Sequence, residues 1–489
     1  MRLAALLVAL GLCIGCPRDA ADAARAADAE GWAAQFRQGT EFLRAKKYAQ
    51  ARDCFRRATQ LNPRSAEAFF FLGVSTLHAG DRHAAEAALR QSVKLDPAAV
   101  NALYNLGVLL LEDGKPGEAA GWLEKARKAG PISPELAINL MRAHLEAGNA
   151  DRAVAIAEIA GPQFSSSVEF DVITGKLFLA RGVAGPACSA LRAADTLEPR
   201  QPAIVLPLAT ACLENHDAAS AQAALDSIKD KAKDSPEYHS LAARAHFLAG
   251  EKEAALAEMN SAIQLAPRDP RLLLLLGRFY QKYGEQQKAV AQLEKAAELD
   301  AKSPEILYSM AVSYIVAEDE PTALKLLDRV FKLDPHYDRA LFLLGSIHLA
   351  ALRLEEAEKP LAEALRLQPQ NPFYLCFYGM LLAAEDHLDD AQAEFRQALA
   401  IRPSYPLVHF HLGRLLERKG DYPAAQAELE KAVSLQPDLA EAYYQLGLLL
   451  NKRGEREKAA QALARFKSLL DAEYSERATI LKELQDTVR

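Results

Sequence analysis

The sequence predicts an all-α protein, an array of helical hairpins repeated along nearly the whole chain. Three observations lead to this prediction: a strict 34-residue period of small residues, apolar residues at helical spacing within each period, and a proline near the end of most periods. A single hairpin cannot bury its apolar face alone, so neighbouring hairpins must stack into one long core. The 489 residues therefore predict one array rather than three globular domains.

Small residues mark the period. When repeats are counted from residue 32 in steps of 34, position 8 is Gly or Ala in twelve of thirteen repeats, and position 20 is Ala in all thirteen. Met141 is the exception at position 8, and position 32 is proline in nine repeats. Small residues let paired helices touch, and proline ends the second helix before the next repeat.

Each repeat reads as two helices joined by a turn. In the third repeat, Leu103, Leu106 and Leu110 recur three or four residues apart, and a second stripe follows the turn at 113–117. Seven first helices open with a proline, which suits the first position of a helix: Pro134, Pro202, Pro236, Pro270, Pro304, Pro372 and Pro406. Five of these are preceded by a residue able to cap the helix: Ser133, Ser235, Asp269, Ser303 and Asn371.

This pattern resembles the tetratricopeptide repeat family, which has a small residue at position 8, alanine at 20 and proline at 32. The resemblance covers residues 32–473, thirteen units of 34 residues. It implies an α-α superhelix, a right-handed solenoid in which the first helix of each repeat lines the concave side. It also implies a non-enzymatic scaffold that binds partner proteins or peptide segments.

The middle of the array is less regular. Lys233 and Ser165 replace proline, Pro207 falls inside a first helix, and 161–167 is rich in turn-forming residues. We expect a local softening near 160–235, either as drift within a degenerate repeat or as a bend between two subarrays. After the last repeat, residues 474–489 are predicted to form a helix that caps the array.

Residues 1–16 read as an export signal, with one positive charge followed by a short apolar run. The Ile14-Gly15-Cys16 ending resembles the lipobox of bacterial lipoproteins, which implies lipidation at Cys16 and a tether over 17–31. Ordinary cleavage in the alanine-rich stretch that follows, or an apolar start on a cytosolic protein, are the alternatives. Cys54, Cys188, Cys212 and Cys376 lack metal-ligand spacing and are interpreted as separate buried apolar residues.

Composition and motifs narrow the function. The net charge of −7 argues against nucleic acid as the main partner. The sequence contains no phosphate-binding loop, dinucleotide fingerprint, nucleophile elbow or His-Glu-x-x-His motif, so it predicts no enzyme, cofactor, metal site or small-molecule substrate. His409 and His411 lie two residues apart on a helix and therefore point to different faces.

The concave surface is the expected binding site. By the family resemblance, positions 2, 5, 9, 12 and 13 of the first helix face the groove. The aromatic residues at position 5 are interpreted either as ligand anchors or as core residues, and the basic residues at positions 9 and 13 either as ligands for an acidic partner or as partners of nearby carboxylates such as Glu146 and Glu305. The candidate partner-binding residues are Arg142, Lys176, Arg244, Arg278, Lys282, Tyr308, Phe342, Phe410, Arg414 and Tyr444. We expect the groove to become positive toward its C-terminal half.

The sequence thus predicts an exported scaffold, periplasmic or bound to the outer membrane through a lipid anchor, in an envelope assembly, secretion or export system. The alternative is a carbohydrate-associated protein that binds an anionic polysaccharide through its aromatic and arginine residues.

Overall fold

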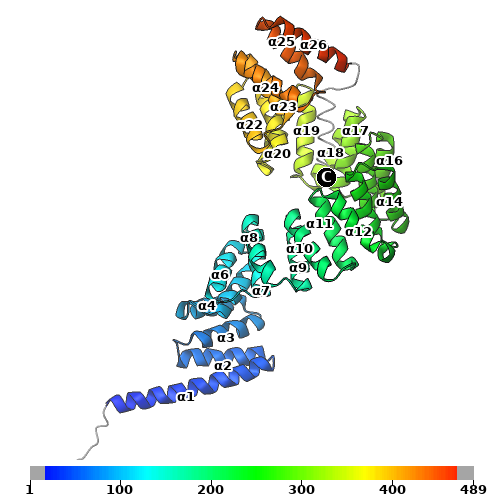
Figure 1. Ribbon diagram of the computed structural model, residues 1–489. Coiled ribbons are helices and arrows are strands. Elements are labelled where there is room, and N and C mark those ends of the chain that lie inside the picture. Colours follow the sequence, from blue (N-terminus) through cyan, green and yellow to red (C-terminus); the bar gives the residue numbers. More distant parts are fainter. Residues whose placement is uncertain (1–16, 471–489) are drawn as a thin grey trace, which may run out of the picture. The chain divides into compact units, whose positions relative to one another are not determined.

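The structure, a computed structural model, describes residues 17–470, and all regular secondary structure in that range is helical. The helices form thirteen hairpins, which stack side by side within each of two compact units (Figure 1). Unit 1 comprises Met1–Lys233 and unit 2 comprises Asp234–Arg489. The division falls at the end of the sixth repeat, where Lys233 stands in place of proline. The predicted all-α solenoid of helix-turn-helix repeats is confirmed.

The helices keep the register of the 34-residue period. From the second repeat onward, every first helix begins at position 1. The first helices are α1 Pro17–Arg44, α3 Ala66–His78, α5 Val100–Glu112, α7 Pro134–Glu146, α9 Val168–Leu179, α11 Pro202–Glu214, α13 Pro236–Leu248, α15 Pro270–Lys282, α17 Pro304–Val316, α19 Asp338–Ala350, α21 Pro372–Ala384, α23 Pro406–Arg418 and α25 Ala440–Lys452. The seven predicted N-terminal prolines all begin their helices, and all five predicted caps accept a backbone N–H.

Every second helix begins at position 17. The second helices are α2 Tyr48–Leu61, α4 Arg82–Leu95, α6 Pro116–Ala129, α8 Ala150–Ala160, α10 Ala184–Leu197, α12 Ala218–Ala232, α14 Lys252–Leu265, α16 Gln286–Leu299, α18 Glu320–Leu333, α20 Leu354–Leu367, α22 Leu388–Ile401, α24 Tyr422–Leu435 and α26 Arg456–Leu470. The short 3-10 helix η1, Gly161–Gln163, follows α8.

Close contact between the two helices of a hairpin explains the small residue at position 8. A Cβ atom on Gly107 would lie 2.6 Å from the Leu123 Cγ and 3.3 Å from the Ala119 carbonyl oxygen. Leu123 and Ala119 occupy positions 24 and 20, and Gly345 would meet Leu361 in the same way at 2.5 Å. The periodic glycine and alanine therefore mark where the helices touch.

Met141 departs from this rule and its partner position departs with it. Position 24 of the fourth repeat is Ala157, where most other repeats carry a leucine. Met141 is fully buried. At this contact the large side chain thus belongs to the first helix and the small one to the second, so the side-chain volume between the two helices is conserved.

The turn inside each hairpin uses a left-handed residue at position 15. Gly114, with φ +70°, donates its N–H to the Leu111 carbonyl oxygen at 3.1 Å, and Lys115 donates to the Leu110 oxygen at 2.9 Å. Glycine fills position 15 in most repeats because it adopts positive φ without strain.

The irregularities in the middle of the chain lie at junctions between repeats, and one of them is Arg200, between α10 and α11, with φ +62°. α8 ends three residues earlier than its counterparts, and η1 continues it to Gln163. The sixth repeat lacks its terminal proline, and there the two units divide. Between these junctions α9 to α12 are continuous helices, and α11 runs through Pro207. The structure is therefore not irregular over the whole of residues 160–235.

The interpretation of four separate buried cysteines is wrong for two of them. Cys188 on α10 and Cys212 on α11 form a disulfide. They lie in adjacent repeats, at positions 21 and 11, where the second helix of one repeat packs against the first helix of the next. Cys54 and Cys376 are buried, and burial raises the pKa of the Cys54 thiol.

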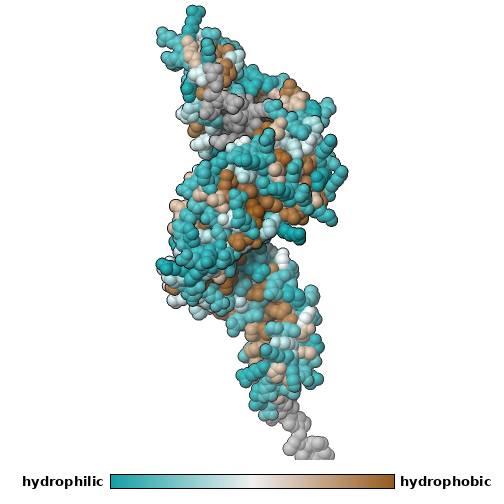
Figure 2. Space-filling model, turned by 90° about the vertical axis from the view of Figure 1, so that its right-hand side faces the viewer, coloured by the Kyte–Doolittle hydropathy of each residue, from teal (hydrophilic) through white to brown (hydrophobic). Residues whose placement is uncertain are grey.

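The core of unit 2 is continuous. One cluster of buried residues extends from Leu273 to Ala462 through the interiors and junctions of successive hairpins. The outer surface is mostly hydrophilic with separate apolar clusters, as one face shows in Figure 2. Some of the exposed apolar residues recur at position 30, such as Leu265, Leu299 and Leu333.

The sequence predicts three features at the two ends of the chain: a signal, a tether and a capping helix. The signal at 1–16, with Cys16, and the capping helix at 474–489 lie outside the described residues. The expected tether at 17–31 is helical, because α1 runs without a break from Pro17 to Arg44. Within the described residues no helix is both long and apolar enough to cross a membrane.

Candidate functional site

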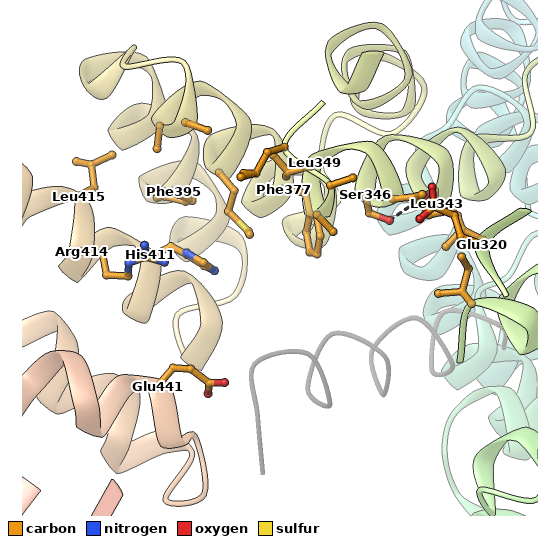
Figure 3. A pocket seen from close by; sticks show the side chains of 18 of the residues that line it. Glu320, Leu343, Ser346, Leu349, Phe377, Phe395, His411, Arg414, Leu415 and Glu441 are labelled. Carbon is orange, nitrogen blue, oxygen red and sulfur yellow. Dashed lines mark hydrogen bonds between the residues drawn. The ribbon is translucent and has the colours of Figure 1, made fainter. Parts of the chain in front are cut away.

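A pocket of about 860 Å³ opens along the first helices of unit 2 (Figure 3). Its walls come mainly from α17, α19, α21, α23 and α25, which belong to five successive repeats. We call this surface the unit 2 groove. It is lined by Ile315, Glu318, Glu320, Leu343, Ser346, Ile347, Leu349, Ala350, Ala351, Leu352, Phe377, Met380, Ala383, Ala384, Phe395, His411, Arg414, Leu415, Arg418 and Glu441.

The residues that line the groove follow the periodicity of the first helices. Most of these residues occupy positions 6, 9, 10, 12 and 13 of a first helix, a single stripe that recurs in each repeat. Position 9, for example, contributes Ser346, Met380 and Arg414. Positions 9, 12 and 13 line this groove, as expected. Position 5 does not line it, and position 6 does so instead.

The floor of the groove is apolar. Leu343 and Phe377, both at position 6, point into it together with Phe395 at position 24 (Figure 3). These three side chains are buried. Leu349 and Leu415 extend the apolar surface on either side. Such a floor accepts apolar side chains of an elongated ligand.

Three aromatic residues proposed as ligand anchors are core residues instead. Tyr308, Phe342 and Phe410 are each at most 2% exposed. The ring of Phe342 lies 4.8 Å from that of Tyr374 and 4.9 Å from that of Phe377, both on the next first helix. Position 5 thus points toward the neighbouring repeat and supports the floor from behind. A sugar cannot stack on Tyr308 or Phe342 in this arrangement.

Tyr374 helps to hold two repeats in register beneath the groove. Its hydroxyl donates to the Asp338 Oδ2 at 2.8 Å. Burial, reinforced by the Asp338 carboxylate, raises the pKa of Tyr374, so the phenol remains a neutral donor. The bond joins the start of α19 to the first turn of α21 and fixes the two helices against each other.

Leu352 forms an unusual rim of the groove. It occupies position 15, the left-handed turn position, with φ +57°. It is also 78% exposed. Glycine would be easier to accommodate in this backbone conformation, and a large apolar side chain in water adds no stability. Exposed, strained residues of this kind are concentrated at ligand-binding surfaces.

The charged residues that line the groove lie in three of its repeats. Glu318 and Glu320 line it in the ninth repeat, and Arg414 and Arg418 line it in the twelfth. Glu320 accepts from the Arg353 Nη2 at 2.5 Å, and Arg418 donates to the Asp386 Oδ1 at 2.8 Å. Along this pocket the acids of the ninth repeat are followed by the arginines of the twelfth, as a groove that turns positive toward its C-terminal half requires, but Glu441 of the thirteenth repeat adds an acid beyond them.

Arg414 is the basic residue best placed to meet a ligand. It is exposed, and its guanidinium lies 5.5 Å from the centre of the Phe410 ring. Among the described residues it makes no ion pair. Phe410 holds the guanidinium over the groove and leaves its N–H groups available for a carboxylate.

The remaining predicted residues are spread over both units. In unit 1, Arg142 donates to Glu146 at 2.9 Å, whereas Lys176 is exposed. In unit 2, Arg278 donates to Glu305 at 2.7 Å, so Glu146 and Glu305 are the carboxylate partners anticipated for these arginines. Arg244 and Lys282 are half-buried, and Tyr444 is 43% exposed with its ring 5.0 Å from that of Phe466. None of these six lines the unit 2 groove.

The two histidines on α23 point in different directions, as expected. His409 contacts the Glu428 carboxylate at 2.5 Å and the Pro403 carbonyl oxygen at 3.0 Å, whereas His411 lines the groove. No cluster of potential metal ligands occurs in the part of the chain that the structure describes.

Sequence reasoning missed the position 6 residues, Leu352 and the disulfide. Position 6 lies on the same face as positions 9, 10 and 13, so helical geometry would have identified it. Leu352 could have been found because it is an apolar residue at position 15, which is otherwise glycine or a polar residue.

Comparison with known proteins supports the repeat assignment. Sequence models described as tetratricopeptide repeats match residues 36–81, 75–134, 110–166, 180–245, 270–303, 308–372, 379–425, 413–454 and 441–469. Together they cover well over half of the chain. The sequence matches none of the curated proteins.

Several solved structures are similar. The Cut9-Hcn1 complex of the APC/C is 15% identical with a TM-score of 0.47, and the match covers 92% of this chain and 95% of that chain. Yeast Tom70 is 16% identical with a TM-score of 0.39 over 94% and 95% of the two chains. PilF of Pseudomonas aeruginosa is 21% identical with a TM-score of 0.37, covering 42% of this chain and 93% of that one. From the repeat register and the family matches along its length, this chain belongs to the tetratricopeptide repeat family.

Proposed function

We propose that this chain is a non-enzymatic scaffold whose unit 2 groove binds an amphipathic segment of a partner protein. Tetratricopeptide repeat proteins bind other proteins or peptides. For this chain we assign the binding to the unit 2 groove and expect the partner segment to be amphipathic.

One observation carries the proposal: the exposed, strained Leu352 stands at the rim of an apolar groove that crosses five repeats. An elongated floor built from successive helices suits a chain segment with apolar side chains on one face. Arg414 supplies a charged contact for an acidic residue of that segment.

The binding test uses two matched pairs of variants in the full chain. Arg414→Glu should weaken capture of the native partner at least tenfold, because it removes a cation and repels an acid. Lys176→Glu, at the same position 9 in unit 1, is the control and should leave capture unchanged. Equal capture by both variants would place the binding site elsewhere.

The second pair separates binding from stability. Leu352→Gly should weaken partner binding and raise stability by about 1 kcal/mol, because glycine tolerates the left-handed conformation. Lys46→Gly changes the equivalent turn of the first repeat, which has the same φ of +57°. It should stabilise its own repeat and leave binding unaltered. Undiminished binding by Leu352→Gly would argue against the groove as the site.

We propose further that the protein is exported and lipid-anchored at Cys16, and that it acts in an envelope assembly, secretion or export system. The N-terminal sequence pattern supports export. The Cys188–Cys212 disulfide adds support, because disulfides persist in oxidising compartments and are rare in the cytosol.

Fractionation tests this location. The wild-type protein should sediment with membranes, and Cys16→Ala should release it into the soluble fraction. A wild-type protein that is already soluble would contradict the anchor. Alkylation of freshly lysed cells followed by mass spectrometry should find Cys188 and Cys212 protected until reduction, and free thiols at both positions would contradict export.

A further inference from the structure

We infer that protonation of His348 separates the ninth and tenth repeats and thereby releases the segment that the unit 2 groove binds. The release rests on the proposed function, whereas the separation of the repeats rests only on the surroundings of His348. This residue belongs to α19. Its neighbours Ile347 and Leu349 line the groove, and His348 itself does not.

Position 11 of a first helix faces the preceding repeat. Cys212 occupies this position, and its disulfide to Cys188 shows that it meets the second helix of the repeat before. His348 stands at position 11 of the tenth repeat, so its ring lies at the junction between α18 and α19. A titratable ring at this junction takes the place of the leucine or tyrosine that most repeats of unit 2 carry there.

The surroundings of the ring favour its neutral form. The Nδ1 of His348 is buried and has no hydrogen-bond partner among the described residues. Arg353, in the turn after α19, donates from its Nη2 to the Glu320 Oε1 at 2.5 Å. Burial lowers the pKa of His348, and the Arg353 guanidinium lowers it further. The carboxylates of Glu356 and Glu320 oppose this shift without reversing it.

These three charged groups come from two sides of the ring. Glu320 begins α18, whereas Arg353 and Glu356 lie at the start of α20. The helices α17 and α21 also pack against α19, and within the described part of the chain they add no charged group that acts on the ring. Glu320 is already held by Arg353. A proton on His348 would therefore place a second cation beside the Arg353 guanidinium in a partly buried junction.

The same junction joins two parts of the groove. Glu320 lines the groove in the ninth repeat, and Leu352, immediately before Arg353, forms its rim in the tenth. The ion pair between Glu320 and Arg353 thus connects the wall to the rim. When the junction opens, the imidazole of His348 gains water and a proton, and the wall and the rim separate.

Acidification favours the open junction. The ordinary pKa of a histidine is 6.5, and the closed junction lowers that of His348, so the open state binds the proton more readily than the closed state does. The contribution of the neutral ring to closure is therefore complete above pH 6.5 and is lost as the pH falls through the pKa of the closed state. Most carboxylates remain ionised at about pH 5.5, so this window isolates the histidines.

Two other repeats carry a histidine at position 11 and provide internal comparisons. His144, in unit 1, is buried, its Nδ1 has no hydrogen-bond partner among the residues described, and burial lowers its pKa. His246, in unit 2, has its Nδ1 2.6 Å from the Glu251 Oε2. The junction of His144 should share the acid sensitivity, although it lies outside the unit 2 groove. The junction of His246 should not, because a carboxylate already faces the ring.

Hydrogen exchange of the full chain at about pH 7.5 and about pH 5.5 tests the junction. After correction for the intrinsic effect of pH on exchange, the amides of α18 and α19 should open about threefold more often at the lower pH. His348→Leu should remove this difference, and leucine suits the site because it stands at position 11 of the next three repeats. His348→Gln, which keeps a polar side chain, should do the same, whereas His144→Leu should retain the difference. No difference in the wild type, or a difference retained in both His348 variants, would overturn the inference.

Photo-crosslinking tests the release. A benzophenone amino acid in place of Met380 lies in the groove, and in extracts of cells that make the full chain its yield of crosslinks to the partner should fall about threefold between the same two pH values. The fall should persist in His144→Leu and disappear in His348→Leu. An equal fall in His348→Leu would assign the pH dependence to another group, such as His411 in the lining, and would contradict the inference.

The two measurements separate this inference from the proposed function. If α19 opens at low pH but position 380 forms no crosslink at either pH, the junction is acid-sensitive and the proposed function fails. If crosslinks form from position 380 and keep their yield at low pH in the wild type, the proposed function stands and the release fails.

Discussion

The two units share one period but differ in how their repeats pack. At position 5, the side chains are half-buried from Phe36 to Leu206 in unit 1, whereas those from Leu274 to Phe410 in unit 2 are buried. At position 28, unit 1 carries mostly polar or small residues, among them Arg127 and Asp195, whereas unit 2 carries apolar ones in every repeat but the last, which has Lys467. The shared spacing of small residues therefore determines where the helices lie. The residues at other positions determine how tightly neighbouring repeats pack against each other.

This difference explains why the groove lies in unit 2. A floor can be held in place only when the residues behind it are fixed, and the rings of Phe342 and Tyr374 stack behind Phe377. Unit 1 is stabilised by local contacts instead. These are the Cys188–Cys212 disulfide and the helix contact at which the large side chain is Met141 and the small one is Ala157.

The largest expected difference between the units is at position 5. Tyr308→Ala should destabilise its repeat by about 3–5 kcal/mol, because it empties a fully buried site. Tyr104→Ala, at the same position in unit 1, should cost about 1–2 kcal/mol, since Tyr104 is half-buried and loses mainly its bond from the Asn139 Nδ2 at 3.0 Å. Hydrogen exchange of α17 and α5 measures both effects, and equal losses would contradict the comparison.

Reduction of the disulfide should act on unit 1 alone. Closing a loop across 24 residues stabilises a fold by about 3 kcal/mol in the chain-entropy model. Dithiothreitol should therefore accelerate hydrogen exchange in α10 and α11 and leave α21 and α23 unchanged. Equal acceleration in both units would show that the disulfide does not stabilise unit 1 alone.

The exchange of bulk in the fourth repeat can be tested by restoring the usual residues. Met141→Ala should cost about 2 kcal/mol by opening a cavity, and Ala157→Leu about 1–3 kcal/mol by overpacking. The double variant should recover at least half of the summed loss, as urea denaturation would show. Strict additivity would mean that the two positions do not share one contact.

The smallest effects concern pH, and they have opposite signs in the two units. Burial raises the pKa of Asp171 in unit 1, and its Oδ2 has no hydrogen-bond partner among the residues that the structure describes. Its contribution to stability is therefore present below pH about 4 and is lost as the pH rises through the folded-state pKa. Asp171→Asn should stabilise unit 1 by about 1 kcal/mol at pH 7, with the gain disappearing at pH 4.

Glu363 in unit 2 behaves in the opposite way. Its bond to Arg366 lowers the pKa from 4.5 to about 2. Its contribution is present above pH 4.5 and is lost as the pH falls toward 2. Glu363→Gln should have a small destabilising effect at pH 7 and none at pH 2, and a constant difference across this range would contradict the ion pair.

Most of the fold was predictable because the period fixes it. The glycines at position 8 and the prolines at position 1 act within a single hairpin, so the sequence reveals them directly. The disulfide was not predictable, since Cys188 and Cys212 meet only through the packing of adjacent repeats. The two interpretations of position 5, core residue or ligand anchor, could not be separated for the same reason: no pattern within one helix distinguishes a side chain that turns toward the neighbouring repeat from one that faces the groove.

Photo-crosslinking from position 9 tests the central claim most directly. A benzophenone amino acid at Met380 lies in the unit 2 groove, and the same residue at Val108 lies at the equivalent position of unit 1. In intact cells, crosslinks to one partner protein, mapped to an amphipathic segment, should form from position 380 and not from 108. Crosslinks that form equally from both positions, or only from 108, would contradict the assignment of binding to the unit 2 groove.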